Sequence, residues 1–290
     1  MSPRPSFFAR VRRALFVLLC AAGVLSGAVL VLHGLGMLPE IEPTEEGQAV
    51  SAQPVEPVPA GKVRDEFRAL ALDIEDIENA ATLSKGYDGV LVAMKEPNGK
   101  LNYVSSIALA ADMEVSSADP GRNAALRAMN QEEGLYTVAL VSCLRDGRLA
   151  QGELALKRVS GSPWLDDGDM GWLDPALEEV QGYLIGVCRE LADLGFDEIL
   201  LADCCYPTSG DLEDLYPIHG KAETLAAFCR RVQGALADHD VKVSIVGQGD
   251  AGEAKSVSGQ TLSLLASFGR VWTAAADKAA LGAFGAVVLP

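Results

Sequence analysis

Basic side chains and histidine are scarce in this chain, whose 290 residues contain 24 Lys and Arg and three His against 40 Asp and Glu. The formal net charge is -16, and because four arginines lie within the first 13 residues, the remainder carries -20. A body this acidic repels phosphate backbones and anionic lipid headgroups. We therefore expect no nucleic-acid partner and no contact of the globular part with a membrane surface.

Ligand motifs for metals and dinucleotides are also missing. The sequence has no CxxC pair and no histidine spacing that would hold a structural zinc, and its first predicted β–α turn lacks a GxGxxG. We expect neither a metal nor a cofactor. The six cysteines do not imply a disulfide framework in a chain this long. Cys143, Cys188 and Cys229 lie in apolar patterns typical of the core, and the adjacent Cys204 and Cys205 are poorly placed to pair with each other.

An apolar segment near the N-terminus predicts a membrane helix. Ala14 to Leu32 are 19 residues without a charge, and the apolar stretch continues to Leu38. At 1.5 Å per residue the uncharged part spans roughly 28 Å, about one hydrocarbon core. Arginines precede it and glutamates follow it, so the positive-inside rule places residues 1–13 in the cytoplasm as a basic tail and makes 14–38 a transmembrane signal anchor. A signal peptide cleaved near Ser26-Gly27-Ala28 is the alternative.

Residues 39–63 predict a linker. Pro39 to Lys62 contain five prolines and five glutamates in 24 residues and almost nothing apolar. Such a segment is stiff and solvated. We expect it to hold the following domain, residues 64–290, off the outer face of the membrane.

In residues 64–290, short β-rich runs alternate with amphipathic helical segments. The predicted strands are Phe67–Leu72, Gly89–Met94, Tyr136–Cys143, Glu198–Ala202, Val241–Val246, Arg270–Ala274 and Ala283–Leu289. The predicted helices are Asn123–Glu133, Pro175–Leu194, Ala222–Ala237 and Thr261–Phe268. Apolar strands alternating with helices predict a parallel α/β fold. We expect a TIM-type (β/α) barrel that is incomplete or has one unrecognised strand, with an open doubly wound sheet as the alternative. Asp174 and Pro175 read as N-cap and first residue of the longest helix.

Polar residues follow most of the predicted strands. In a parallel α/β fold, sites form at the carboxyl ends of the strands. Those ends carry Lys95, Asp146, Asp203 and Gln248 with Asp250. Two carboxylates across such a mouth are the machinery of glycoside hydrolysis, although solvated loops are also polar. Trp164 and Trp172 lie in an aspartate-rich loop and suit either stacking on sugar rings or packing of that loop on the barrel.

Several stretches carry a resemblance to a known family. They are Tyr87–Tyr103 (YDGVLVAMKEPNGKLNY), Leu144–Ala150 (LRDGRLA), Trp164, Trp172–Pro175, Tyr183, Glu190 and Gly195–Pro207 (GFDEILLADCCYP). The chain resembles the glycoside hydrolase-like domain of bacterial envelope proteins, a TIM-barrel family whose last motif reads GFDEIQFDYVRFP. The resemblance covers most of residues 66–275 and implies a carbohydrate partner, a cell-envelope polysaccharide. On that basis Asp203 with Asp146 or Asp250 forms the catalytic pair. The substrate-binding set is Lys95, Trp164, Trp172, Tyr206 and Gln248.

Other positions depart from the family pattern. Polar residues of the family are replaced here by Ala93, Leu140, Ala202, Cys205 and Val246. Each of these positions is expected to point from a strand end toward the barrel mouth. Asp203 is offset by one from the family's acidic residue, which in a strand reverses the direction of the side chain unless the strand end is bulged.

Two hypotheses follow from these matches and departures. The first is a membrane-anchored glycoside hydrolase of the cell envelope. The second is a degenerate barrel that binds a saccharide or a protein and cleaves nothing. A thiol enzyme at Cys204 and Cys205 is disfavoured because His219 and His239 lie elsewhere. For Lys95 we expect a carboxylate partner, first Asp146, because an unpaired buried ammonium group is costly.

Overall fold

The structure, a computed structural model, describes residues 67–290; the predicted transmembrane segment 14–38 and linker 39–63 lie outside the described residues. Within 67–290 no helix is both long and apolar enough to cross a bilayer. All seven predicted strands are present. They are β1 (Ala69–Leu72), β2 (Gly89–Lys95), β3 (Thr137–Ser142), β4 (Glu198–Ala202), β5 (Lys242–Gly247), β6 (Val271–Thr273) and β7 (Val287–Val288).

The strands form one sheet in the order β1 to β7, and every neighbouring pair is parallel. A doubly wound sheet would reverse its strand order at a switch point, so the doubly wound alternative is wrong. Sequential order is the order of a TIM-type barrel. Among the described strands β1 and β7 are the two edges, and the barrel is incomplete, as predicted.

The curvature of the sheet is visible in an aromatic contact between its distant strands. Five inter-strand steps separate β1 from β6, which in a flat sheet would be about 24 Å. The rings of Phe67, just before β1, and Trp272, on β6, nevertheless have centroids 5.8 Å apart. The inner face of the curved sheet carries its own apolar cluster. It consists of Ala69, Leu91, Val138, Leu200, Val246 and Trp272.

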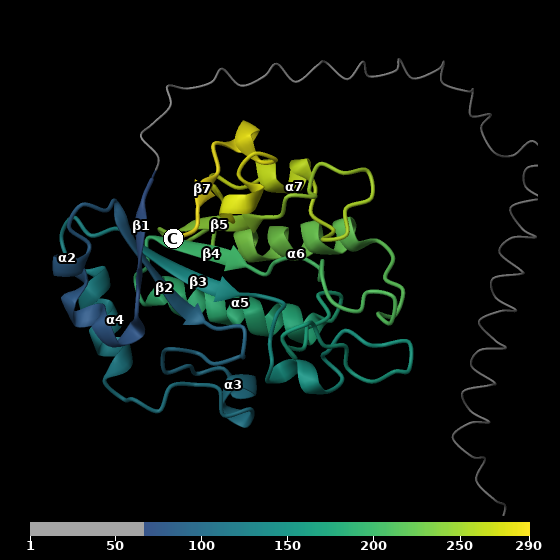
Figure 1. Cartoon of the computed structure of the whole chain (residues 1–290). Coiled ribbons are helices and arrows are strands. Elements are labelled where there is room, and N and C mark those ends of the chain that lie inside the picture. The colour runs from purple at the N-terminus through teal and green to yellow at the C-terminus, as the bar shows by residue number, and fades with distance from the viewer. Residues whose placement is uncertain (1–66) are drawn as a thin grey trace, which may run out of the picture. The chain divides into compact units, whose positions relative to one another are not determined.

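Helices cover the outer face of the sheet and bury a second, larger apolar layer (Figure 1). They are α2 (Ala80–Leu83), α3 (Ala108–Asp112), α4 (Arg122–Asn130), α5 (Glu178–Asp193), α6 (Lys221–Ala235) and α7 (Leu262–Ala266), with 3-10 helices η1 (Ile74–Asn79), η2 (Leu149–Gln151), η3 (Ala275–Asp277) and η4 (Gly282–Phe284). The start predicted for α5 is wrong. Its N-cap is Leu177, because Asp174 instead accepts a hydrogen bond from the Ala176 N–H and closes a turn before the helix.

A buried carboxylate lies at the amino-terminal end of the strands. Glu198 is completely buried and accepts hydrogen bonds from the Tyr136 hydroxyl and the Trp272 indole N–H, both at 2.8 Å. The Arg270 Nη1 lies 2.5 Å from Glu198 Oε2, the oxygen that also accepts from Tyr136, and the guanidinium stacks over the Phe67 ring. Burial, together with the charge of Glu198 and the hydrogen bond to it, raises the pKa of Tyr136, so the phenol remains a donor. This network closes the base of the barrel opposite the strand ends.

Candidate functional site at the strand ends

The Lys95 ammonium group pairs with a carboxylate, as predicted. Its Nζ lies 2.8 Å from Asp146 Oδ2 and donates to the Ser142 carbonyl at 2.7 Å. Asp146 Oδ1 accepts from the backbone N–H groups of Arg148 and Leu149, which holds the turn after β3. Both side chains of the pair are fully buried. The pair holds together the ends of two neighbouring strands, and the expected roles of Lys95 in substrate binding and of Asp146 in catalysis stay predictions.

A β-bulge explains why Lys95 does not face the barrel mouth. The pairing of β2 with β3 shifts between Ala93 and Lys95, so Ala93 lies opposite Leu140 and Lys95 lies opposite Val141. Leu140 packs on the inner cluster, whereas Val141 lies in the layer under the helices. An extra residue in one strand re-aims the side chains that follow it. Lys95 accordingly pairs with Asp146 in the outer layer.

Asp203 is turned toward the mouth by its backbone. It follows β4 directly and has φ of 46°, in the left-handed region that non-glycine residues seldom adopt. Its Oδ2 accepts a 2.6 Å hydrogen bond from the hydroxyl of Ser142. Ser142 lies opposite Ala202 and two residues beyond Leu140, on the inner face of the sheet. The left-handed conformation of Asp203 therefore has the effect expected of a bulge, because it directs the half-buried carboxylate toward the inner face.

Arg145 stands beside Asp203 at the same edge of the sheet. Its Nε donates to Asp166 Oδ2 at 2.6 Å, and 31% of its side chain remains exposed. The hydrogen bond to Asp166, with the charges of Asp166 and Asp203, raises the pKa of Arg145 above its ordinary value. Asp166 in turn is held by the Trp172 indole N–H and by backbone donors of its own turn. Arg145 is thus a fixed, accessible donor at the mouth.

Asp250 follows β5 and is committed to its own loop. Its two oxygens accept hydrogen bonds from the backbone N–H and the hydroxyl of Ser258, at 2.9 and 2.5 Å. Burial would raise the pKa of Asp250, but these hydrogen bonds outweigh it and hold the pKa below its ordinary value. Burial lowers the pKa of Lys221, and the charge of Asp250 opposes this shift.

Gln248, also at the end of β5, is half-buried. Its backbone N–H donates to the side-chain oxygen of the buried Gln260.

A pH dependence follows from the lowered pKa of Asp250. Because its folded pKa lies below the unfolded value of about 3.9, the ionised carboxylate stabilises the fold above roughly pH 4. That contribution is lost as the pH falls through the folded pKa. We expect Asp250→Asn to lower the free energy of unfolding by about 1 kcal/mol at pH 7, with the difference vanishing in acid. Urea unfolding between pH 7 and pH 2.5 measures this, with the exposed Asp167→Asn as control. A penalty unchanged at pH 2.5 would contradict it.

The two tryptophans and Tyr206, which are predicted to bind substrate, are buried in this structure. Trp164 is completely buried and its indole N–H donates to the Asp211 carbonyl. Trp172 is 7% exposed and donates to Asp166. Tyr206 is 1% exposed, and burial with the charge of Asp174 raises its pKa to about 12. The loop packs on the barrel, which was the alternative for the tryptophans.

An exposed aromatic ring at this end of the barrel is Tyr216, which sequence reasoning missed. Tyr216 is 60% exposed and lies in the loop after β4. Its backbone N–H donates to the Lys157 carbonyl in the loop after β3. Arg158 and Leu215 form an isolated antiparallel β-bridge between the same two loops. The two loops are thereby joined at the carboxyl end of the barrel. A tyrosine followed by proline in a loop of Asp, His and Gly was the available signal.

The floor of the mouth is apolar. Leu140, Ala202 and Val246 belong to the inner cluster, and Ala93 shares the register of Leu140. These are four of the positions at which the family pattern has polar side chains. The structure thus places these four apolar side chains at the positions from which a polar group would reach a ligand in the mouth. What this site can do chemically is hydrogen-bond a polar ligand through Asp203 and Arg145 over an apolar floor.

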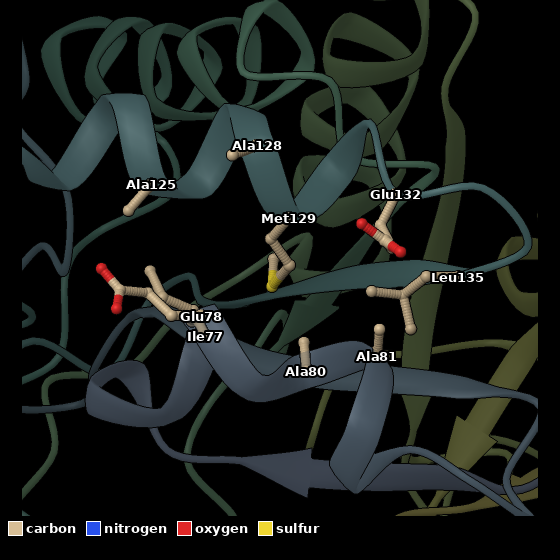
Figure 2. A pocket seen from close by; sticks show the side chains of 9 residues that line it. All are labelled: Ile77, Glu78, Ala80, Ala81, Ala125, Ala128, Met129, Glu132 and Leu135. Carbon is tan, nitrogen blue, oxygen red and sulfur yellow. The ribbon is translucent and has the colours of Figure 1, made fainter.

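A pocket of about 240 Å³ lies elsewhere, between α4 and the segment formed by η1 and α2. Figure 2 shows Met129 and the methyl groups of four alanines facing one another across it, with Glu78 and Glu132 at its sides. It is smaller than the roughly 300–1,000 Å³ of typical ligand pockets and lies away from the strand ends. Among residues 67–290, no cluster of three or more His, Cys, Asp or Glu is placed to hold a metal.

Comparisons with known proteins agree with this architecture. The family model described as "Putative glycosyl hydrolase domain" matches residues 78–268. The fold is similar to that of a hypothetical protein from Ruminiclostridium thermocellum ATCC 27405, at 22% identity and a TM-score of 0.53, covering 60% of this chain and 96% of that one. It is also similar to the PgaB (BpsB) glycoside hydrolase domain from Bordetella bronchiseptica, at 14% identity and a TM-score of 0.50, covering 76% and 79%. No curated protein matches the chain.

Proposed function

We propose that this protein is a membrane-anchored barrel that binds a cell-envelope polysaccharide without efficient hydrolysis. The chain belongs to the glycosyl hydrolase domain family whose model matches residues 78–268. The uncharged segment within 14–38 and the acidic, proline-rich residues 39–63 support an anchor and a stalk. They would hold the barrel on the extracytoplasmic side, where envelope polysaccharides lie.

One observation carries the choice of binding over hydrolysis. Glycoside hydrolysis needs two carboxylates, one as proton donor and one as nucleophile or base. Of the three expected here, Asp146 is buried in its ion pair with Lys95, and Asp250 is held by Ser258 with its pKa lowered. A proton donor needs a raised pKa instead. Asp203 is left beside Arg145 above an apolar floor, a set that suits hydrogen bonds to sugar hydroxyls.

Residual hydrolysis is the second candidate, and one feature favours it. The left-handed backbone of Asp203 directs a carboxylate back to the mouth, although the sequence offset alone would have turned it away. Asp203 follows β4 and Asp250 follows β5, which is the neighbouring strand of the sheet. Asp203 with Asp250 is therefore the pair on which any remaining hydrolysis would depend.

Asp203→Asn tests the binding site directly. Asparagine tolerates the left-handed conformation and can still accept from Ser142, so we expect the melting temperature to stay near that of the wild type. A hydrogen bond to a charged group contributes about 1.5–3 kcal/mol, so retention on purified envelope polysaccharide should fall about tenfold or more. The measurement is a pull-down with the full chain in detergent.

The exposed Asp167→Asn is the matched control, because it removes the same charge from a neighbouring loop. It should bind as the wild type does. Equal retention of all three proteins would show that Asp203 does not contact the polysaccharide.

A further inference from the structure

Five buried cysteines gather on the outer side of the sheet and just beyond the strand ends. Cys143 follows β3, Cys204 and Cys205 follow β4, Cys188 lies on α5 and Cys229 on α6. All five have at most 3% of their surface exposed and belong to the apolar layer between sheet and helices. The site at the strand ends uses none of these thiols as a ligand-binding group.

Two of the thiols are in contact. The Sγ atoms of Cys204 and Cys229 lie 3.6 Å apart. A disulfide has an S–S distance of about 2.05 Å, so the sulfurs would need to approach by about 1.5 Å. In a disulfide, rotation of the two side chains would have to supply that movement. Cys143, which follows the neighbouring strand β3, also raises the pKa of Cys204, which makes Cys143 the competing partner.

We propose that Cys204 and Cys229 are joined by a disulfide in the native protein. The proposal rests on the proposed extracytoplasmic location, because dithiols oxidise and persist as disulfides outside the reducing cytosol. The pair links the carboxyl end of β4 to α6, two elements that are adjacent in the barrel. The adjacent pair Cys204–Cys205 lacks such geometry, since neighbouring residues cannot reach a relaxed disulfide.

The oxidant is the disulfide of a thiol–disulfide oxidoreductase. The thiolate of one cysteine attacks that disulfide and forms a mixed disulfide, which releases one thiolate of the oxidoreductase. The thiolate of the second cysteine then attacks the mixed disulfide, which forms the Cys204–Cys229 bond and releases the second thiolate. The substrate loses two protons and two electrons, and the oxidant becomes a dithiol. Because both thiols are buried in the folded domain, the exchange belongs to folding, before α6 docks on the sheet.

The bond would brace the loop that carries the site. It closes the segment from 204 to 229, which starts next to Asp203 and contains Tyr216. Loop closure of this length stabilises a fold mainly by constraining the unfolded chain. For a domain of this size we expect reduction to lower the melting temperature by about 5–10 °C. We also expect reduction to weaken polysaccharide retention, because the turn at Asp203 is then no longer held by the adjacent disulfide.

Thiol mapping of the full chain tests the proposal. The protein is expressed in bacteria with its anchor, the envelope fraction is denatured without reductant, and free thiols are alkylated before digestion. We expect a disulfide-linked peptide pair containing Cys204 and Cys229, whereas Cys188 in the same digest is alkylated. Full alkylation of both Cys204 and Cys229, or a link between Cys204 and Cys143, would overturn the proposal.

A second arm separates this result from failure of the proposed location. Protease treatment of intact spheroplasts reports the side of the membrane on which the barrel lies. If the barrel is cytoplasmic, the location fails and the geometry is tested by refolding the full chain in detergent with oxidised glutathione. Formation of the Cys204–Cys229 link then supports the pairing, and its absence refutes it. Cys229→Ala should abolish the effect of reductant on the melting temperature, whereas Cys188→Ala should preserve it.

Discussion

Asp146→Ala is expected to lower the free energy of unfolding by about 3–5 kcal/mol, which is a large part of the stability of a typical domain. The variant leaves the Lys95 ammonium group completely buried with no carboxylate beside it. It also removes the oxygen that accepts from the N–H groups of Arg148 and Leu149. Urea denaturation followed by circular dichroism measures the loss.

A double variant separates the buried charge from the fold itself. Replacing both partners with apolar residues of similar size, as in Lys95→Met with Asp146→Leu, should recover much of the loss, because no isolated charge is then buried. The exposed Asp167→Ala should change the stability by less than about 0.5 kcal/mol. If Asp146→Ala were as mild as that control, Lys95 would not depend on the ion pair.

Glu198→Ala should be similarly damaging, at about 3–5 kcal/mol. It leaves Arg270 at the barrel base without its counter-charge and removes the acceptor for the buried Trp272 indole N–H and the half-buried Tyr136 hydroxyl. Glu198→Gln should cost less, because the amide oxygen still accepts one of these hydrogen bonds. The measurement is again urea unfolding at pH 7.

The exposed Glu213→Ala controls for loss of one negative charge. A spectroscopic readout adds to the stability data, since loss of Glu198 should lower the pKa of Tyr136 toward its ordinary value. An ultraviolet titration of the phenol would show this shift in Glu198→Gln. A Tyr136 titration unchanged by the variant would contradict the network at the base.

The strands follow from the sequence because each is a short apolar run that must be buried on both faces. Their order does not, since alternating strands and helices fit both a barrel and a doubly wound sheet, and only the sequential order of β1 to β7 in the structure decides for the barrel. The start of α5 was not predictable in this way. Asp174 and Pro175 have the composition of a helix start, but the same residues also suit the turn they form.

The site was harder to predict because single backbone conformations decide where its side chains point. The pairing of Lys95 with Asp146 follows from the cost of an unpaired buried charge. Its position away from the mouth depends on a bulge in β2 that the run of apolar residues does not reveal. The direction of Asp203 depends on one left-handed residue. For Trp164, the acidic loop suggested exposure, but neighbouring loops cover the ring completely.

The most direct test of a barrel that binds without efficient hydrolysis is release of reducing ends from purified envelope polysaccharide by the full chain. The polysaccharide must first be shown to be retained by the protein, so that absence of turnover is not absence of contact. The account predicts retention with reducing-end release no faster for the wild type than for Asp203→Asn. Robust release by the wild type that disappears in Asp203→Asn would contradict it and would establish the chain as an active glycoside hydrolase.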